Sequence, residues 1–237
     1  MSLLIPSRRL LLAPKRDPFP RWIGRPVFQF DPDTIQLLDG DPMSLWMDIG
    51  GPGNHLTQVP GARPVLKRGI LNGHSVVRFG GTDDWMSTAN LLPAAQAQPT
   101  TIIIVAKVTT NAAAQVIYDG VTTRQYLFKD ALDTGGAYYG APTQVTGENP
   151  HTWGSFEIYT CVFNGLSSAL WINGVAKGTG DAGTASLTRV ILGDNGTPGT
   201  AKLNGDVTYF VGYPKGLNVA ERRALDLYFG RRFLITV

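Results

Sequence analysis

Short runs of β-branched and aromatic residues, separated by turn-forming residues, repeat along most of this chain and favour a fold built from short strands. Thr100–Val108 (TTIIIVAKV) is apolar almost throughout, which predicts a strand buried on both faces. Phe156–Phe163 carries bulky residues on both faces, as a central strand does. Asn173-Gly174 favours a type I′ hairpin turn between 168–172 and 175–177, because both residues tolerate a positive φ. Further strands are expected at 27–30, 75–79, 115–118, 125–129, 187–192 and 207–211.

One helix is predicted near the end of the chain. Asn218 and Glu221 have the spacing of a capping box, and an apolar stripe with Leu225 and Tyr228 follows. Gly230 is placed to end the helix. Elsewhere the 28 glycines and only three glutamates disfavour helices, so the fold class is all-β, with one C-terminal helix across the sandwich edge that seals the core.

Residues 1–26 differ from the rest and are expected to form an extended arm in front of a domain spanning 27–237. Five prolines disfavour a helix there and favour a polyproline-like conformation. The first 30 residues hold six basic residues and one aspartate, whereas the whole chain has a net charge of +3, so the remainder is slightly acidic. The arm is predicted to dock on other chains through Arg8, Arg9, Leu10, Leu11, Leu12, Lys15, Arg16, Phe19, Arg21 and Trp22.

Several classes of protein fit the sequence poorly. The basic charge belongs to the arm and not to a folded face, which argues against a nucleic-acid partner. No apolar stretch is long enough to insert in a membrane, and the run Leu10–Ala13 is too short for a signal peptide. The single cysteine, Cys161, excludes an intrachain disulfide and reads as a small buried apolar residue.

A family resemblance adds to this interpretation. The motifs are Trp46-Met-Asp48-Ile-Gly50, Val76-Val77-Arg78-Phe79, Gly80-Gly81-Thr82-Asp83-Asp84-Trp85, Leu170-Trp171-Ile172-Asn173-Gly174 and Asn204-Gly205-Asp206-Val207. With these motifs in this order, the chain resembles the concanavalin A-like, laminin-G-like jelly-roll domains common in bacteriophage virion proteins and bacterial surface proteins. The resemblance implies a jelly-roll β-sandwich over about residues 30–235, and it says less about function, because this architecture has many roles.

Catalytic and metal-binding patterns are not found in the sequence. Glu148, Glu157 and Glu221 are isolated, whereas glycosidases of this architecture use two neighbouring carboxylates, so no enzymatic activity and no cofactor are expected. The turns at Asp48–Gly51 and Gly80–Asp84 are expected to place carboxylates on local backbone N–H groups. Arg78 is expected to form an ion pair with Asp83 or Asp84, and a calcium site at these two aspartates is the alternative.

The first functional hypothesis is a bacteriophage virion structural protein, either a minor tail protein or a capsid decoration. It would be made in the host cytoplasm, and its arm would dock on other virion proteins in an oligomeric particle. The alternative is a carbohydrate-binding module for host surface glycans, with Tyr138, Tyr139, Asp194 and Asn195 as the candidate site. A glycoside hydrolase is a third reading that the missing carboxylate pair disfavours.

Overall fold

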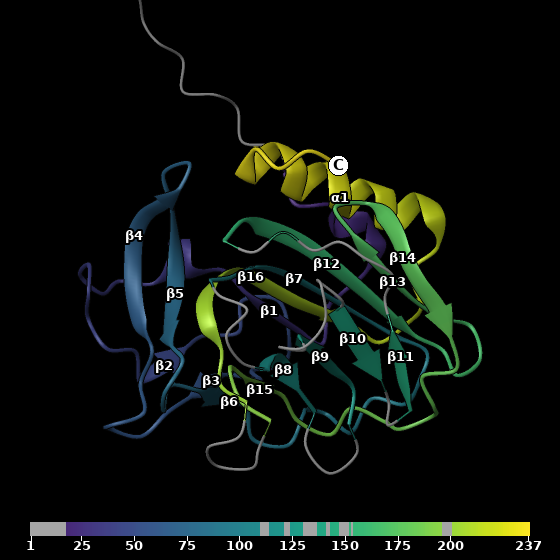
Figure 1. The fold of residues 1–237 in the computed structure, drawn as a ribbon, viewed down its shortest axis with the longest axis horizontal. Helices are drawn as coiled ribbons and strands as arrows, with labels where there is room; N and C mark the ends of the chain where they lie inside the picture. The colour runs from purple at the N-terminus through teal and green to yellow at the C-terminus, as the bar shows by residue number, and fades with distance from the viewer. Residues whose placement is uncertain are drawn as a thin grey trace, which may run out of the picture.

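The computed structural model describes residues 18–109, 114–120, 124–129, 137–140, 143–146, 152, 154–195 and 201–237. They form two antiparallel sheets packed face to face, with one helix outside them (Figure 1). This confirms the all-β sandwich and the single C-terminal helix. The first sheet runs in the order β14 (Val175–Gly180), β13 (Ser168–Ile172), β12 (Phe156–Phe163), β7 (Thr100–Val108), β16 (Asn204–Tyr213), β5 (His74–Gly80) and β4 (Val65–Leu71), with β1 (Phe28–Phe30) also paired to β16.

The second sheet is assembled from shorter strands. Its order is β11 (Gln144–Thr146), β10 (Ala137–Gly140), β9 (Tyr126–Lys129), β8 (Gln115–Asp119), β15 (Ile191–Leu192), β6 (Met86–Ser87), β3 (Leu56–Thr57) and β2 (Leu45–Trp46). The strands expected at 115–118 and 125–129 are confirmed as β8 and β9, which pair antiparallel. The strand expected at 187–192 is shorter than predicted, because Leu187 makes only an isolated bridge to Gln96.

Strand β7 shows how the core is organised. Its alternate residues Ile102 and Ile104 enter the main core between the sheets, while Ile103 and Val105 point to the opposite face. All four are buried, so the continuous apolar run is explained by burial on both faces.

The helix α1 (Val219–Phe233) provides the cover on that opposite face. Its Leu225, Phe229 and Phe233 form a second apolar core with Ile103, Val105, Tyr209 and other residues of the first sheet. The predicted position across the sandwich edge is therefore wrong: the helix lies on the outer face of the first sheet, as Figure 1 shows. It covers a second core and does not seal the first.

The predicted start of α1 is confirmed, but its predicted end is not. The capping box is confirmed, because Asn218 accepts a hydrogen bond from the Glu221 N–H and Glu221 accepts one from the Asn218 N–H. Gly230 does not end the helix, which continues to Phe233 and is capped by Leu234 in the left-handed region. At Gly230 a Cβ would lie 2.8 Å from Val237 Cγ2, so this glycine allows the last residues of the chain to pack closely on the helix.

The hairpin between β13 and β14 has the predicted turn, with φ of 51° at Asn173 and 75° at Gly174. A second turn of the same kind joins β4 to β5 through Asn72 and Gly73, with φ of 50° and 87°. Both residues of each turn have positive φ, as a type I′ turn requires.

Part of the predicted arm belongs to the folded domain. Arg21–Ile23 forms a 3-10 helix, Ile23 is buried in the second core, and the Phe19 ring lies 5.3 Å from Tyr228. Residues 18–26 are thus not an extended arm, and Phe19 is not free to dock elsewhere. Arg21 and Trp22 remain exposed. The remaining predicted docking residues lie outside the described residues: Arg8, Arg9, Leu10, Leu11, Leu12, Lys15 and Arg16.

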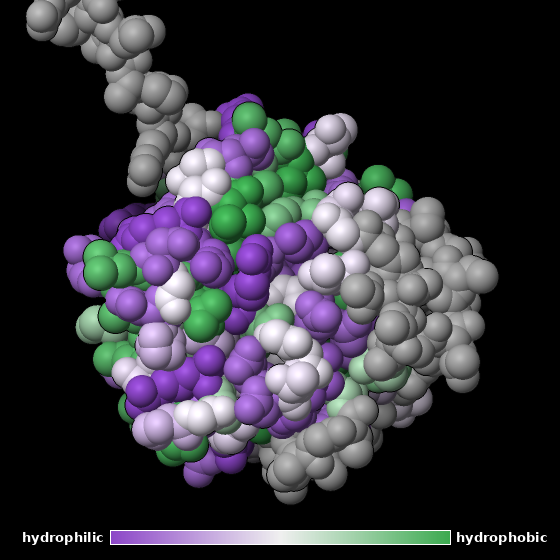
Figure 2. All heavy atoms as spheres, turned by 60° about the vertical axis from the view of Figure 1, so that its left-hand side comes forward, coloured by the Kyte–Doolittle hydropathy of each residue, from purple (hydrophilic) through white to green (hydrophobic). Residues whose placement is uncertain are grey.

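Cys161 is buried, and burial raises the pKa of its thiol to about 12, which agrees with an apolar role. Within the described residues, no helix is long and apolar enough to cross a membrane. Figure 2 brings the left-hand side of Figure 1 forward and shows polar side chains over most of the coloured surface, with apolar ones in small groups. The coloured part of this face therefore offers no broad apolar interface.

Candidate functional site

The tyrosine pair predicted to bind a glycan does not form an exposed platform. Tyr139 lies in β10, fully buried, with its ring 5.9 Å from that of Phe163 in the main core. The glycines around it suggest a loop, but Gly140 is a strand residue beneath the ring of Tyr126. A Cβ on Gly140 would lie only 2.6 Å from the Tyr126 hydroxyl oxygen. The backbone of Tyr138 pairs with β9 and β11, while its side chain lies outside the described part.

Asp194 and Asn195, the other predicted pair, lie at the end of β15. Asp194 is buried and forms an ion pair with Lys202, with 2.5 Å between Oδ2 and Nζ. Its other oxygen accepts a hydrogen bond from the Asn195 N–H. The loop that carries Asp84 lies alongside, because a Cβ on Gly193 would be 3.3 Å from the Asp84 carbonyl oxygen. The structure therefore brings two of the four predicted glycan residues, Asp194 and Asn195, close to the loop of the predicted calcium residues.

The turn that holds Asp83 and Asp84 is built as predicted. Asp84 Oδ2 accepts a hydrogen bond of 2.6 Å from the Gly80 N–H. Burial, which is the largest effect, raises the pKa of the Asp84 carboxyl group, and the positive charge of Lys202 acts in the opposite direction. In the described part of the chain no three His, Cys, Asp or Glu side chains gather in a way that could hold a metal ion. The positive charge between the Asp84 loop and the Asp194 loop is that of Lys202.

The predicted partner of Arg78 is wrong. Arg78 donates to both carboxylate oxygens of Asp206, its cross-strand neighbour in β16, at 2.7 and 3.1 Å. Lys107 contacts the same buried carboxylate at 2.7 Å. This three-residue cluster holds the first sheet together and leaves Asp83 and Asp84 without that arginine.

Trp85 directly follows Asp84 in the chain. Met86, the next residue, is buried in the main core, so the alternation of an extended chain puts Trp85 on the outer face of the second sheet. The Trp85 side chain is only partly buried. The Asp84 and Asp194 carboxylates, the Asn195 amide and the Lys202 ammonium share one region, which we call the polar end, and Trp85 follows Asp84 directly in the chain.

Further along this outer face lies a row of cross-strand neighbours. Ser87, Ile191 and Asp119 are paired in register across β6, β15 and β8. Ile191 lies on the outer face, because its neighbour Leu192 is in the main core. Each end of the row holds a guanidinium group: Arg189 donates to the Ser87 hydroxyl at 3.0 Å, and Arg124 donates to Asp119 at 2.8 Å. We call these five residues the arginine row.

Sequence reasoning missed the arginine row, because only the sheet register brings it together. Arg189 and Ser87 are 102 residues apart in sequence. Arg124 is close to Asp119 in sequence, but that spacing alone does not show that Asp119 is fully buried and that Arg124 lies over the Tyr126 ring, 4.9 Å from its centre.

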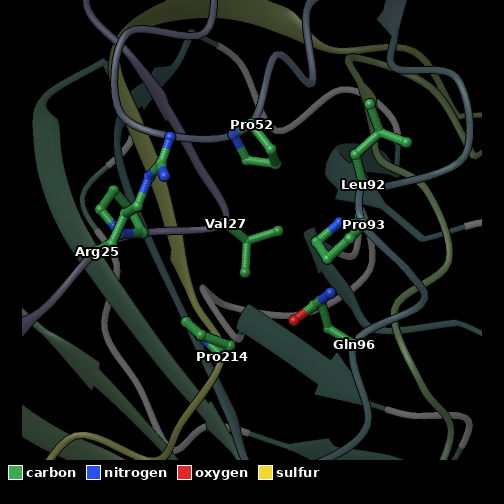
Figure 3. A pocket seen from close by; sticks show the side chains of 8 residues that line it. Arg25, Val27, Pro52, Leu92, Pro93, Gln96 and Pro214 are labelled. Atoms are coloured by element: carbon green, nitrogen blue, oxygen red, sulfur yellow. The ribbon is translucent and has the colours of Figure 1, made fainter.

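A pocket of about 180 Å³ lies elsewhere, where residues 25–27 meet the segments around Pro52, Leu92 and Pro214. Figure 3 shows Val27 in its centre, surrounded by prolines, with Arg25 and Gln96 as its polar side chains. Arg25 is held at the rim by hydrogen bonds to the carbonyl oxygens of Gly50 and Gly51. An apolar lining with few polar groups suits an apolar fragment better than a ligand rich in hydroxyl groups.

The wall of this pocket is rigid. Asp48 accepts hydrogen bonds from five backbone N–H groups, those of Gln29, Gly50, Gly51, Gly53 and Asn54, which confirms the predicted local role of its carboxylate. The Asn54 side chain bonds the Val27 carbonyl and the Leu92 N–H. These contacts shape the loop beside the pocket.

The two glutamates in the described residues have structural partners. Glu157 is buried in β12 and accepts hydrogen bonds from the Tyr159 hydroxyl and the Thr152 N–H. Glu221 belongs to the helix cap and is paired with Lys215. Glu148 lies outside the described residues.

No family model matches the chain, and a search of curated proteins found no match. Solved structures do match. The binding domain of botulinum neurotoxin serotype D has a TM-score of 0.62 at 10% identity, over 87% of this chain and 51% of that one. The fold is the concanavalin A-like sandwich. This chain spans about half the length of the toxin domains that it matches.

Two further neighbours have been solved with sugars. The ligand-binding domain of the same toxin, in complex with N-acetylneuraminic acid, has a TM-score of 0.62 at 9% identity, over 87% of this chain and 51% of that one. The CBM40 of the Ruminococcus gnavus IT-sialidase, bound to α2,3-sialyllactose, has a TM-score of 0.50 at 15% identity, over 64% of this chain and 95% of that one. At such identities the likeness concerns the fold alone.

Proposed function

We propose that this protein binds carbohydrate without cleaving it, and that the ligand lies on the outer face of the second sheet beside Trp85. The observation that carries the proposal is a partly exposed tryptophan, Trp85, that directly follows Asp84 of the polar end in the chain. A pyranose ring presents apolar C–H groups on its faces and hydroxyl groups at its edge. The Trp85 ring offers a surface to the C–H groups, and the Asn195 amide and the Asp84 carboxylate offer partners to the hydroxyl groups, while the buried Asp194–Lys202 ion pair holds their loops.

Three further observations support this reading. Structural neighbours of the same fold have been solved with sialic acid and with sialyllactose. The side chains of Glu157 and Glu221 are taken up by structural hydrogen bonds, so neither is placed to act in a glycosidase pair. The polar groups at the site come from loops supported by paired strands, which limits their movement before binding.

The role in a phage virion stays a proposal that rests on the family resemblance. In the described part of the predicted arm, Arg21 and Trp22 are the docking residues that remain exposed, and Trp22 is 65% exposed. Location in a virion and assembly with other virion proteins are proposed with it. Glycan binding is compatible with that setting, since a virion protein can display a sugar-binding domain.

The test is a glycan array with the wild-type protein and Trp85→Ala, followed by calorimetry on the best ligand. We expect binding of the wild type to a defined set of glycans and a loss of affinity of about tenfold or more in the variant, because stacking on the ring is removed. Trp22→Ala is the matched control, since that tryptophan is exposed on another part of the chain.

Binding that Trp85→Ala leaves unchanged would contradict the site, and the absence of binding to any glycan would contradict the function. Turnover of a bound glycan would contradict the non-catalytic part of the proposal. Circular dichroism of each variant checks that the fold is intact. Tyr139→Ala is unsuitable as a test of binding, because it would open a cavity in the main core.

A further inference from the structure

The arginine row has a geometry that points to the kind of sugar chain it would hold. Ser87 and Asp119, which anchor the two guanidinium groups, lie on strands either side of β15. Two strand spacings separate the anchors, about 10 Å. Side chains of cross-strand partners leave a sheet on the same side, so both arginines belong to one face.

The two arginines remain able to bind an anion. The Arg124 side chain is 44% exposed, and Asp119 uses its Nε and Nη2 groups, so Nη1 is the group without a hydrogen bond among the described residues. Arg189 donates to the neutral Ser87 hydroxyl and has no carboxylate partner among the described residues. Its Nε is buried and makes no hydrogen bond in the same part of the chain.

The residues around Arg124 fix the orientation of its guanidinium group. Arg124 is held from one side by the buried Asp119 carboxylate and from below by the Tyr126 ring, which itself lies over Gly140. A guanidinium group that is already oriented loses little conformational entropy when it binds a second planar acceptor. Carboxylates are such acceptors, because two oxygens match the fork of N–H donors.

We propose, building on the proposed glycan binding, that the arginine row selects acidic polysaccharides, with carboxylates of the sugar chain bound by Arg189 and Arg124. The separation of the anchors is comparable to the length of a disaccharide. A chain with a carboxylate on every second sugar can therefore place successive carboxylates on the two arginines while it crosses β6, β15 and β8. Ile191 lies between the anchors and is only 4% exposed, so the contacts to the sugar chain come from the two arginines.

The experiment compares three ligands on the full chain by calorimetry: a hyaluronan hexasaccharide, which carries a carboxylate on every second sugar, its carboxyl-reduced form, and a neutral cellohexaose. We expect the acidic chain to bind at least about tenfold more tightly than its reduced form. Arg189→Gln keeps a donor for Ser87 and loses the charge, and it should lower affinity for the acidic chain alone by about tenfold.

Arg124→Lys tests the other end of the row, because it keeps a positive charge beside Asp119 and removes the fork. It should also weaken binding of the acidic chain. Arg21→Gln is the matched control for the change in net charge and should leave affinity unchanged, since Arg21 is exposed in the N-terminal 3-10 helix.

Equal affinity for the acidic chain and its reduced form would overturn this inference and leave glycan binding in place. Equal losses in Arg189→Gln and Arg21→Gln would overturn it too, since only net charge would then matter. A tighter complex with a DNA oligonucleotide of the same charge would identify a phosphate-binding surface instead. If none of the sugars in this experiment or on the glycan array binds, the proposed function fails together with the inference.

Discussion

Asp226 is a residue whose environment disfavours its charged form. Asp226 belongs to α1 and its side chain is fully buried. Neither carboxylate oxygen makes a hydrogen bond of good geometry within the described residues, although the Thr160 hydroxyl lies close to it, and Arg222 approaches only to 4.0 Å. Burial raises the pKa of this carboxyl group from 3.8 to about 6, and the opposing effects of the Arg222 and Arg223 charges and of the Thr160 hydroxyl do not offset it. The protonated form therefore favours folding.

The stability of the protein should depend on pH through this group. A folded pKa above the unfolded value means that the penalty is complete above pH 6 and disappears as the pH falls toward 4. About two pKa units correspond to about 3 kcal/mol. We expect Asp226→Asn to be more stable than the wild type at pH 7.5 by up to about 3 kcal/mol, with the difference shrinking in acid.

Urea unfolding of the wild type and Asp226→Asn between pH 4.5 and 7.5 measures this difference. Asp83→Asn is the control, because Asp83 is exposed and its removal should change the free energy of unfolding little. A difference between Asp226→Asn and the wild type that stays constant with pH would show that the charge is not the cause.

Other single residues show where sequence reasoning stops. The role of Asp48 as an acceptor of local N–H groups could be predicted, because its partners are mostly within six residues. The Arg78–Asp206 pair spans 128 residues and depends on the register of β5 with β16. No local sequence pattern contains that register, so the prediction that Arg78 pairs with the nearby Asp83 or Asp84 is wrong.

At the scale of elements, the sequence predicts the strands and the helix that have turn or cap residues of their own. It does not predict the short strands that form only because a neighbouring strand pairs with them. The β13–β14 hairpin and the start of α1 have turn and cap residues that act within four positions. The two-residue strands β2, β3 and β6 have no periodicity of their own and exist because a neighbouring strand pairs with them. Part of the candidate site lies on β6. Because β6 could not be predicted from the sequence, the face of the sheet that carries the site could not be predicted either.

The helix cap is the element whose contribution can be measured most directly. Asn218→Ala leaves the Glu221 N–H without its acceptor, and we expect a loss of about 1 kcal/mol in the free energy of unfolding. Val219→Ala, one residue further and 72% exposed, should have little effect. Equal losses in both variants would contradict a specific role of the cap, and Asn218→Asp should restore most of the stability.

At the scale of the whole molecule, the protein has three layers: the second sheet, the first sheet and the helix α1. The segment 18–26 packs beside α1 on the outer face of the first sheet. Ile23 is 2% exposed in the second core, Phe19 stacks on Tyr209, and Arg25 bonds the loop at Gly50 and Gly51. The proline content and charge of residues 1–26 predicted a separate arm, since composition does not show that Phe19 and Ile23 would find an apolar surface made by α1 and the first sheet.

Removal of residues 1–26 should therefore destabilise the domain. Ile23→Ala removes one buried aliphatic side chain, and we expect a loss of about 2–5 kcal/mol. The truncated protein should lose at least as much, because Phe19 and Arg25 go with Ile23. Trp22→Ala should unfold like the wild type, since Trp22 lies in the same segment but is exposed. Thermal and urea unfolding of the three variants measures this. If the truncated protein were as stable as the full chain, residues 18–26 would contribute nothing to the stability of the fold. The prediction of a docking arm over residues 1–26 would then hold.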